Sequence, residues 1–494
     1  MSKLKVATLV SLLLSLASTH ASAQGPCPTS TSTNPNAPLL QRSGDLVCAI
    51  PQLYGPGGLV GINKNGPLLP TDTLVNKPHE VHFQAGALES FTPLNAEIGT
   101  QLSQLPLTSP ASGFVFSFNP SLGVVSRTTE SFGPILTERA ETVGKHKLFV
   151  GVSYQLFDFN KVDGVSLKNF GTVFQHEDVA PCANGSLTGP CSPPLPNNGN
   201  PLLENDIIGT TNNISLKVHQ ITAVATFGLT NRLDVSVAVP ILDVRMGVSS
   251  DATIYSFEPP DPVNIPNGNH QDHQFVPTTP DFNAGHETVV APNHALFYNA
   301  RSMSGVGDVI FRGKFQVLQK EKAGLAVGAD LHTPTGDEKN FLGSGAWGVR
   351  PFAVFSYASR VEPHATFGYQ RNGDSYLAGN ITTFSKDHLP DILTYSAGAD
   401  AGITRRVSIS GDYIGQSLLS VKTILSKPFI DHSGATHSTI VTSGKETVNQ
   451  ASIAVGGKVN PFGKLLVSAN VLFRVNDAGL HSKPAPLVGL SYTF

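Results

Sequence analysis

Apolar and polar residues alternate along most of the chain after residue 147. Val150, Val152 and Tyr154, for example, are interleaved with Gly151 and Ser153. This two-residue period predicts β-strands with one apolar face. Twelve such stretches lie at residues 147–157, 214–229, 233–248, 305–319, 324–334, 346–358, 361–373, 391–403, 407–421, 447–459, 464–476 and 486–494. Most reach the ~9–11 residues that a tilted strand needs to cross a bilayer.

The connections between these stretches alternate between short and long. The short ones are residues 230–232, 320–323, 359–360, 404–406 and 460–463, and the long ones are 159–213, 249–304, 335–345, 374–390, 422–446 and 477–485. A soluble β-sandwich would also alternate along its strands, but it has no reason to sort its loops by length. Short turns at one end and long loops at the other are typical of transmembrane β-barrels. We therefore predict an all-β fold, a transmembrane antiparallel β-barrel of about twelve strands.

Lipid cannot satisfy backbone N–H and C=O groups, so a spanning sheet must close on itself. Strand 147–157 is therefore expected to pair with strand 486–494. The apolar faces should then contact lipid and the charged faces should line the lumen.

The first 143 residues have a different character. Lys3 and Lys5, the apolar run 6–17 and the small residues 21–23 predict a signal peptide over residues 1–23. Residues 24–143 contain 14 of the 36 prolines. Proline removes a ladder donor, so this proline-rich segment is not mostly central strand. We predict a periplasmic extension or a plug over 24–143, followed by the barrel over 144–494.

Composition narrows the class of protein further. Only 14% of the residues are charged, against about 25% in typical soluble domains. The formal net charge is −3 and Lys and Arg are not clustered, which argues against nucleic acid as a partner. In the oxidising compartment implied by a signal peptide, four cysteines favour disulfides. Neighbour pairing is one of three possible connectivities of Cys27, Cys48, Cys182 and Cys191.

The chain also resembles a known family. Residues 131–145 (SFGPILTERAETVGK) run straight into the strand at 148–159, and an Asp163-Gly164 turn follows. This stretch resembles bacterial outer-membrane proteins named for the meta-cleavage pathway of phenol degradation. They are similar in broad terms to long-chain fatty-acid and aromatic-hydrocarbon channels. The resemblance extends over about residues 130–494 and implies a monomeric barrel in the bacterial outer membrane that passes small apolar or aromatic molecules.

The C-terminal strand carries a further resemblance. Val488, Leu490, Tyr492 and Phe494 form an alternating apolar face that ends on an aromatic residue. This resembles the signal by which outer-membrane barrels are recognised for insertion, which implies the barrel-assembly machinery as a partner.

Charged residues fall on the predicted inner face by strand parity. They are Asp308, Arg312, Lys314, Asp330, His332, Arg350, His364, Asp400, Asp412, Lys458 and Arg474. Such residues can create a transverse field along a solute pathway. They can also form a paired network that fills the lumen, because buried charges are normally paired. A twelve-stranded barrel lies between filled eight-stranded barrels and open porins of 16–18 strands, so we expect a restricted channel.

Three other functions are weighed against transport. Gly373-Asp374-Ser375 resembles the start of a lipase motif, and His364 or His388 would be its base in an outer-membrane hydrolase. No Gly-x-Ser-x-Gly motif is present, and we interpret the segment as a turn. A metal site could use residues of one long loop, namely His270, Asp272, His273, His286 and His294. A structural or adhesive surface barrel would act through its long loops. We predict a non-enzymatic outer-membrane channel without metal or cofactor, for passive uptake of small solutes.

Overall fold

The structure is a computed structural model. It describes residues 44–54, 81–109, 116–119, 124–127, 131–175, 206–255, 275, 287–291, 293–320, 322–380 and 385–494. The predicted signal peptide lies outside these ranges, as do Cys27, Cys182 and Cys191. Cys48 lies inside them and is buried and disulfide-bonded.

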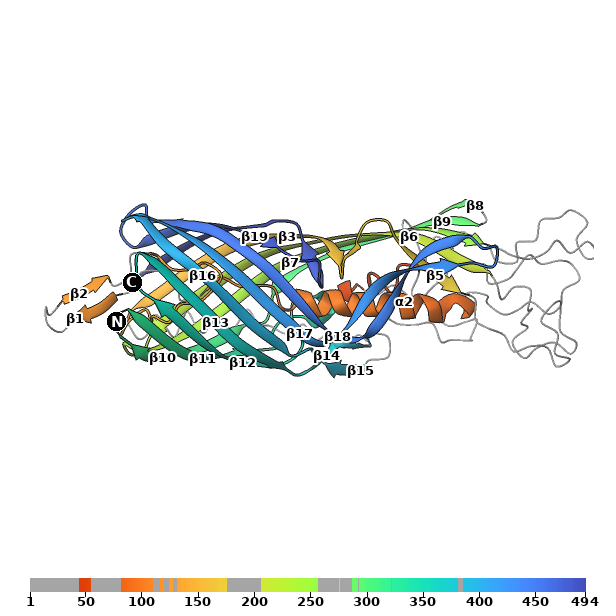
Figure 1. Ribbon diagram of the computed structural model, residues 1–494. Helices are drawn as coiled ribbons and strands as arrows, with labels where there is room; N and C mark the ends of the chain where they lie inside the picture. Colours follow the sequence, from red (N-terminus) through yellow and green to blue (C-terminus); the bar gives the residue numbers. More distant parts are fainter. Residues whose placement is uncertain are drawn as a thin grey trace, which may run out of the picture.

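The wall is a closed barrel of twelve antiparallel strands, so the predicted fold class is confirmed (Figure 1). In chain order these are β3 (Leu148–Val162), β6 (Ile207–Gly228), β7 (Leu233–Tyr255), β9 (His294–Val306) continued by β10 (Ile310–Gln319), β11 (Ala323–His332), β12 (Gly348–Tyr357), β13 (Val361–Asn372), β16 (Ile392–Thr404), β17 (Val407–Ile430), β18 (Thr436–Val459), β19 (Leu465–Arg474) and β21 (Ala485–Thr493). The first and last strands pair as predicted, with Tyr154 opposite Val488.

Shorter elements lie around and inside this wall. They are η1 (Leu46–Cys48), α2 (Val81–Leu102), β1 (Phe116–Asn119), β2 (Val124–Arg127), β4 (Val165–Ser166), β5 (Phe170–Gln175), β8 (Glu287–Ala291), η2 (Glu338–Asn340), β14 (Asp374–Asn380), β15 (Ser385–His388) and β20 (Leu480–Ser482). Helix α2 lies among the barrel strands, whereas the β1–β2 hairpin lies beyond the end that holds the C-terminus (Figure 1). Among the described helices, none combines the length and the apolar character needed to cross a membrane.

The structure differs from the sequence-based elements in several places. The predicted loop 422–446 is largely strand, because β17 and β18 are 24 residues each and pair almost to the hairpin tip. The predicted strand 305–319 is interrupted between β9 and β10, although β7 pairs with both. Helix α2 was not predicted, because Pro93 lies in its interior, where proline removes a hydrogen bond and normally ends a helix.

An apolar belt surrounds the part of the barrel that lies nearer the short turns. We call this part the lower part of the barrel and the part nearer the long connections the upper part. Phe311, Val455 and Leu490 are each at least half exposed although they are large and apolar. Such a contiguous exposed surface is unfavourable in water and favourable in lipid. The ten-residue strand β12 lies between two exposed aromatic residues, Trp347 before it and Tyr357 at its last position. Aromatic side chains at both edges of the belt are typical of the two interfaces of a membrane.

The polarity of the wall inverts along the long strands. In the lower part of β6, Ile221 and Phe227 point outward, and their neighbours on the inner face are mostly polar. Higher on the same strand, Leu216 and Val218 are buried inside while Lys217 points outward. The inward side chains of β3, β6 and β7 change in polarity at the same level. Gln155 of β3 pairs with Gln220 of β6, and Gln220 pairs with Leu242 of β7. We call this level the polarity boundary, and it marks the outer surface of the membrane.

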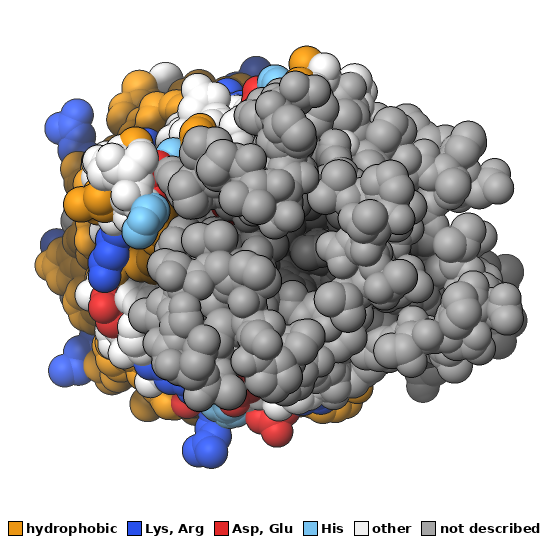
Figure 2. All heavy atoms as spheres, turned by 90° about the vertical axis from the view of Figure 1, so that its right-hand side faces the viewer, with side chains coloured by type: hydrophobic (Ala, Val, Ile, Leu, Met, Phe, Trp, Pro, Cys, Tyr) orange, Lys and Arg blue, Asp and Glu red, His pale blue; other side chains and the backbone are white. Residues whose placement is uncertain are grey.

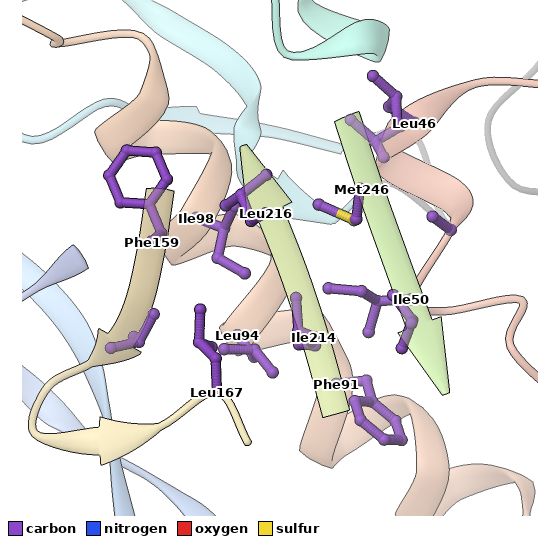
Figure 3. Packing of buried hydrophobic residues seen from close by; sticks show 14 of the residues in the cluster. Leu46, Ile50, Phe91, Leu94, Ile98, Phe159, Leu167, Ile214, Leu216 and Met246 are labelled. Carbon is purple, nitrogen blue, oxygen red and sulfur yellow. The ribbon is translucent and has the colours of Figure 1, made fainter. Parts of the chain in front are cut away.

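Above the polarity boundary the barrel contains an apolar core. Phe91, Leu94 and Ile98 of α2 pack with residues 46–54 and with inward side chains of the wall such as Ile214 and Leu216 (Figure 3). Burial of these side chains in water-exposed strands is driven by the hydrophobic effect, as in a soluble protein. Figure 2 views the molecule from this end and shows hydrophobic side chains on the outer wall, with charged side chains beside them.

Candidate functional site

A segment of the N-terminal region crosses the lower lumen. We call residues 131–143 the strap, because they are tied to the wall at several points. The side chain of Glu362 accepts from the backbone N–H of Ser131 at 3.3 Å, and Asp234 accepts from Val143 N–H at 3.0 Å. The polar inner face of the barrel therefore serves as the binding surface for a buried piece of backbone.

Two buried lysines bind the strap through its carbonyl groups. Lys458 Nζ donates to Gly133 O at 2.8 Å and to Pro134 O at 2.7 Å. Lys314 Nζ donates to the backbone oxygens of residues 139 and 141 at 2.9 and 2.8 Å. A lysine ammonium has three donors, so a group of backbone oxygens satisfies it even without bulk water. Both lysines therefore hold the strap in the lumen.

The third anchor is a histidine between two carboxylates. His364 Nε2 lies 2.6 Å from Asp412 Oδ1, and its Nδ1 lies 3.3 Å from Asp400 Oδ2. The strap joins this group through Thr137, whose hydroxyl donates to Asp412 at 2.8 Å. All of these side chains except Thr137 lie on the inward positions that strand parity predicted.

A chamber of about 220 Å³ lies above the strap. Leu136 and Glu138 of the strap form its floor, and Leu102 and Leu342 lie at its upper side. Residues 103–109, which continue from α2 and which we call the crossing segment, form one side. A second cavity of about 70 Å³ shares Leu105 and four other lining residues with the chamber.

The crossing segment is fixed to the wall by hydrogen bonds. Gln220 donates to the carbonyl of Pro106 at 3.0 Å, and Gln370 donates to the side chain of Gln104 at 3.1 Å. At its lower end, Ser109 N–H donates to the strap carbonyl of Ile135 at 2.9 Å. The N-terminal region therefore forms the floor and one side of the chamber, and most of the remaining lining comes from the barrel wall.

Charged residues of the wall meet at one side of the chamber. Arg312 Nε donates to Asp330 at 2.6 Å and its Nη1 donates to Glu138 of the strap, while Arg350 Nε donates to Asp330 at 2.9 Å. The carboxylate of Asp330 is thus shared between two guanidinium groups, and its side chain is fully buried. Arg312, Arg350 and His332 line the chamber, while Asp330 supports the two arginines from behind.

The predicted lumen residues therefore fall into separate groups. Asp308, Arg312, His332 and Arg350 line the chamber. Asp308 also accepts from Ser344 N–H at 2.7 Å, which ties down the loop before β12. Lys314, Asp400, Asp412 and Lys458 belong to the strap anchors. Arg474 lines the second cavity and donates to Ala478 O at 2.7 Å.

Other chamber residues were missed by the sequence analysis. Gln370, Ile392 and Ile414 face the chamber from β13, β16 and β17. Strand parity places these three side chains inward, but the sequence analysis considered only charged residues as candidates. Leu105 and Glu138 come from the proline-rich segment, whose path through the lumen has no signal in the hydrophobic pattern.

The residues of the alternative functions lie elsewhere or make other contacts. The hydroxyl of Ser375 donates to Glu338 at 3.1 Å, whereas His388 contacts Asp374 and Asp391, both at 3.3 Å. Neither His388 nor His364 is thus engaged as a base for Ser375. His270, Asp272, His273 and His286 lie outside the described residues, and His294 Nε2 lies 2.7 Å from Asp251. Within the described ranges, no cluster of three or more His, Cys, Asp or Glu residues is arranged to hold a metal.

Fold and surface together define the class of protein. The barrel is closed, its apolar belt faces lipid, and short turns and long connections are sorted to opposite ends, which is the architecture of bacterial outer-membrane barrels. The protein is therefore an outer-membrane β-barrel, as predicted.

One of the comparisons with known proteins concerns the family that the sequence resembles. Residues 209–417 match a family model described as "Putative MetA-pathway of phenol degradation". None of the curated proteins matches the chain. Among solved structures, an outer-membrane channel from Pseudomonas putida F1 is similar at 10% identity, with 72% of this chain and 98% of that chain covered and a TM-score of 0.40. A Pseudomonas aeruginosa FadL homologue has 11% identity, coverage of 71% and 90%, and a TM-score of 0.30. The Ralstonia pickettii toluene transporter TbuX has 9% identity, coverage of 72% and 92%, and a TM-score of 0.25.

Proposed function

We propose that this protein is an outer-membrane channel for the passive uptake of small apolar or aromatic solutes. The observation that carries the proposal is the chamber, a cavity of mixed polarity inside a barrel that spans lipid. Its volume of about 220 Å³ is below the ~300–1,000 Å³ of pockets for drug-sized ligands, which favours smaller solutes. The match of residues 209–417 to a family named for phenol degradation agrees with an aromatic solute.

In this proposal residues 1–23 direct export and the C-terminal strand, ending at Phe494, is read by the barrel-assembly machinery. The proline-rich segment acts as a plug rather than a periplasmic extension. Two observations support the plug: α2 packs inside the barrel core, and the strap binds the inner face of the wall.

The strap is the part of the plug that we expect to move. Its anchors are mainly hydrogen bonds and the Arg312–Glu138 ion pair, and water entering the lumen can solvate the polar and charged groups that a displaced strap leaves behind. Displacement of α2 would instead expose the apolar core to water, at about 25 cal/mol per Å². A solute would therefore enter the periplasm past a displaced strap, with the upper core left in place.

Single-channel recording of the full mature chain in planar bilayers tests the proposal. The double substitution Lys314→Met and Lys458→Met removes the two ammonium groups that hold the strap carbonyls. We expect it to raise the conductance or the fraction of time open relative to the native chain. Lys427→Met is the matched control, because Lys427 is exposed near the β17–β18 hairpin tip. If neither the native chain nor the double variant produced channel currents, the proposed channel function would be wrong.

A further inference from the structure

The chamber is lined by one charged side chain, that of Arg350, whose hydrogen-bond donors are only partly used. Arg350 directs Nε and Nη2 to the same oxygen of Asp330, and its Nη1 has no hydrogen-bond partner among the described residues. Its side chain is 25% exposed, against 11% for Arg312, 9% for Glu138 and 0% for Asp330. A solute in the chamber therefore meets the guanidinium of Arg350 before any carboxylate of this cluster.

The carboxylate of Asp308, which also lines the chamber, is occupied by protein donors. One of its oxygens accepts from Gly336 N–H at 3.0 Å, and the other accepts from both the N–H and the hydroxyl of Ser344. Both oxygens of Asp308 are thus directed to protein donors, and the carboxylate of Glu138 is balanced by Arg312 and by Lys314 Nζ at 3.7 Å, whereas a donor of Arg350 is left over.

A second unpartnered polar group lies near Arg350. His332 Nε2 is buried and makes no hydrogen bond among the described residues. The side chains of His332 and Gln370 lie on either side of Gly348, which has no side chain to separate them. A Cβ added to Gly348 would lie 3.3 Å from His332 Cβ and 3.4 Å from Gln370 Nε2. Buried polar atoms are normally paired, so an orphaned ring nitrogen beside a cavity is available to a ligand.

Apolar surface begins directly beside these polar groups. Ile392 is the register partner of Gln370 on the next strand and faces the chamber. Leu105 of the crossing segment lines the chamber next to Gln104, the residue that Gln370 binds. A ligand that fits must therefore carry a compact apolar body and one acceptor group at its end.

We propose that the chamber binds a small monocarboxylate with a compact apolar body, such as an aromatic acid, through the free nitrogen of Arg350 and the ring of His332. The planar fork of arginine matches a carboxylate, and such charge-assisted hydrogen bonds are about twice as strong as neutral ones. This proposal names the solute of the proposed channel and rests on that function for its physiological role.

Calorimetric titration of the detergent-solubilised full chain tests binding separately from transport. Benzoate is the probe, and benzamide is the neutral molecule of the same shape. We expect benzoate to bind about ten-fold more tightly than benzamide, and Arg350→Gln to remove this preference. Arg350→Lys keeps the charge without the fork and should retain part of it. Arg360→Gln is the matched control, because Arg360 lies exposed in the turn after β12.

Benzoate flux into proteoliposomes, measured relative to benzamide flux, should change in the same order across these variants. Equal binding of benzoate and benzamide, or unchanged benzoate binding by Arg350→Gln, would overturn the carboxylate assignment. If benzoate binds as expected but no variant passes any solute, the site stands and the channel function fails. If Arg350→Gln loses the circular dichroism of the folded barrel, that variant cannot be used. The Arg350→Lys variant and the comparison of benzoate with benzamide then test the carboxylate assignment.

Discussion

Single residues show how a membrane protein tolerates charge in its interior. Asp330 is buried between Arg312 and Arg350, and both guanidinium groups depend on its two oxygens. Removal of one partner from a buried ionic group is costly because the remaining charge stays buried and unpaired. The sequence located all three residues on the inner face by parity, but it could not say which charges pair.

Asp330→Asn should therefore destabilise the barrel by about 3–5 kcal/mol, because two guanidinium groups lose their shared counter-charge. Urea unfolding of the protein in lipid vesicles measures this. Asp374→Asn is the control, since the Asp374 side chain is 67% exposed. Similar unfolding midpoints for the two variants would mean that Asp330 has no such structural role.

Among the elements, α2 differs most from what the sequence predicts. Periodicity identified the strands because each has one face toward lipid or water and one face inward. The helix is surrounded by the wall, and its proline and mixed composition conceal it. Contacts distant in the chain hold it in place: Asn95 donates to Val47 O at 2.9 Å, and Gln101 accepts from Leu480 N–H at 2.5 Å. Such contacts are set by the closed barrel, so no local pattern could have indicated them.

The docking of α2 should depend on pH through Glu97. Burial, followed by the nearby charge of Asp163, raises the pKa of Glu97 well above its usual range. The docked helix therefore retains a proton that the undocked helix releases above a pKa of about 4.3. Docking is strongest in acid and weakens as pH rises from that value through the raised pKa. Hydrogen exchange of residues 91–102, corrected for intrinsic rates, should show protection that falls as the pH is raised above about 4.3.

Glu97→Gln provides the comparison for this prediction. The amide removes the titrating charge at the same size and still offers an oxygen to Gln101, which donates to Glu97 at 2.9 Å. The variant should show protection that is nearly independent of pH. Equal pH dependence in the native chain and the variant would assign the effect to another group.

At the scale of the whole molecule, the barrel could be predicted far better than its contents. Twelve strands, their pairing into a closed wall and the direction of their faces follow from alternation and loop lengths, because lipid leaves few alternatives for a backbone. The height of the wall could not be predicted from the same pattern. Above the polarity boundary the apolar face of each strand points inward. The residues still alternate there, but the apolar positions face the interior instead of lipid.

The lipid-facing belt gives a test of the whole arrangement. Val327 lies in the middle of β11, exposed and opposite Phe315 and Ala353. Val327→Arg should destabilise the barrel in lipid by about 2–4 kcal/mol, as expected for a charge near the bilayer midplane. Ile430→Arg, at the end of β17 and also exposed, should have little effect because it lies beyond the belt. Equal costs measured by urea titration in vesicles would contradict the assigned position of the membrane.

The inversion of polarity along β6 and β7 also fixes how deep the molecule sits. Displacement into the membrane by two residues, about 7 Å along a strand, would bring Asp243 into hydrocarbon. Displacement by the same amount in the other direction would leave Ile221 and Ile241 in water. Because Gln220 and Leu242 line the chamber at this level, its upper edge is held at the depth of the lipid headgroups. In the proposed channel, a molecule resting there would already have passed the outer surface of the membrane, and the strap would be the remaining obstacle in its path.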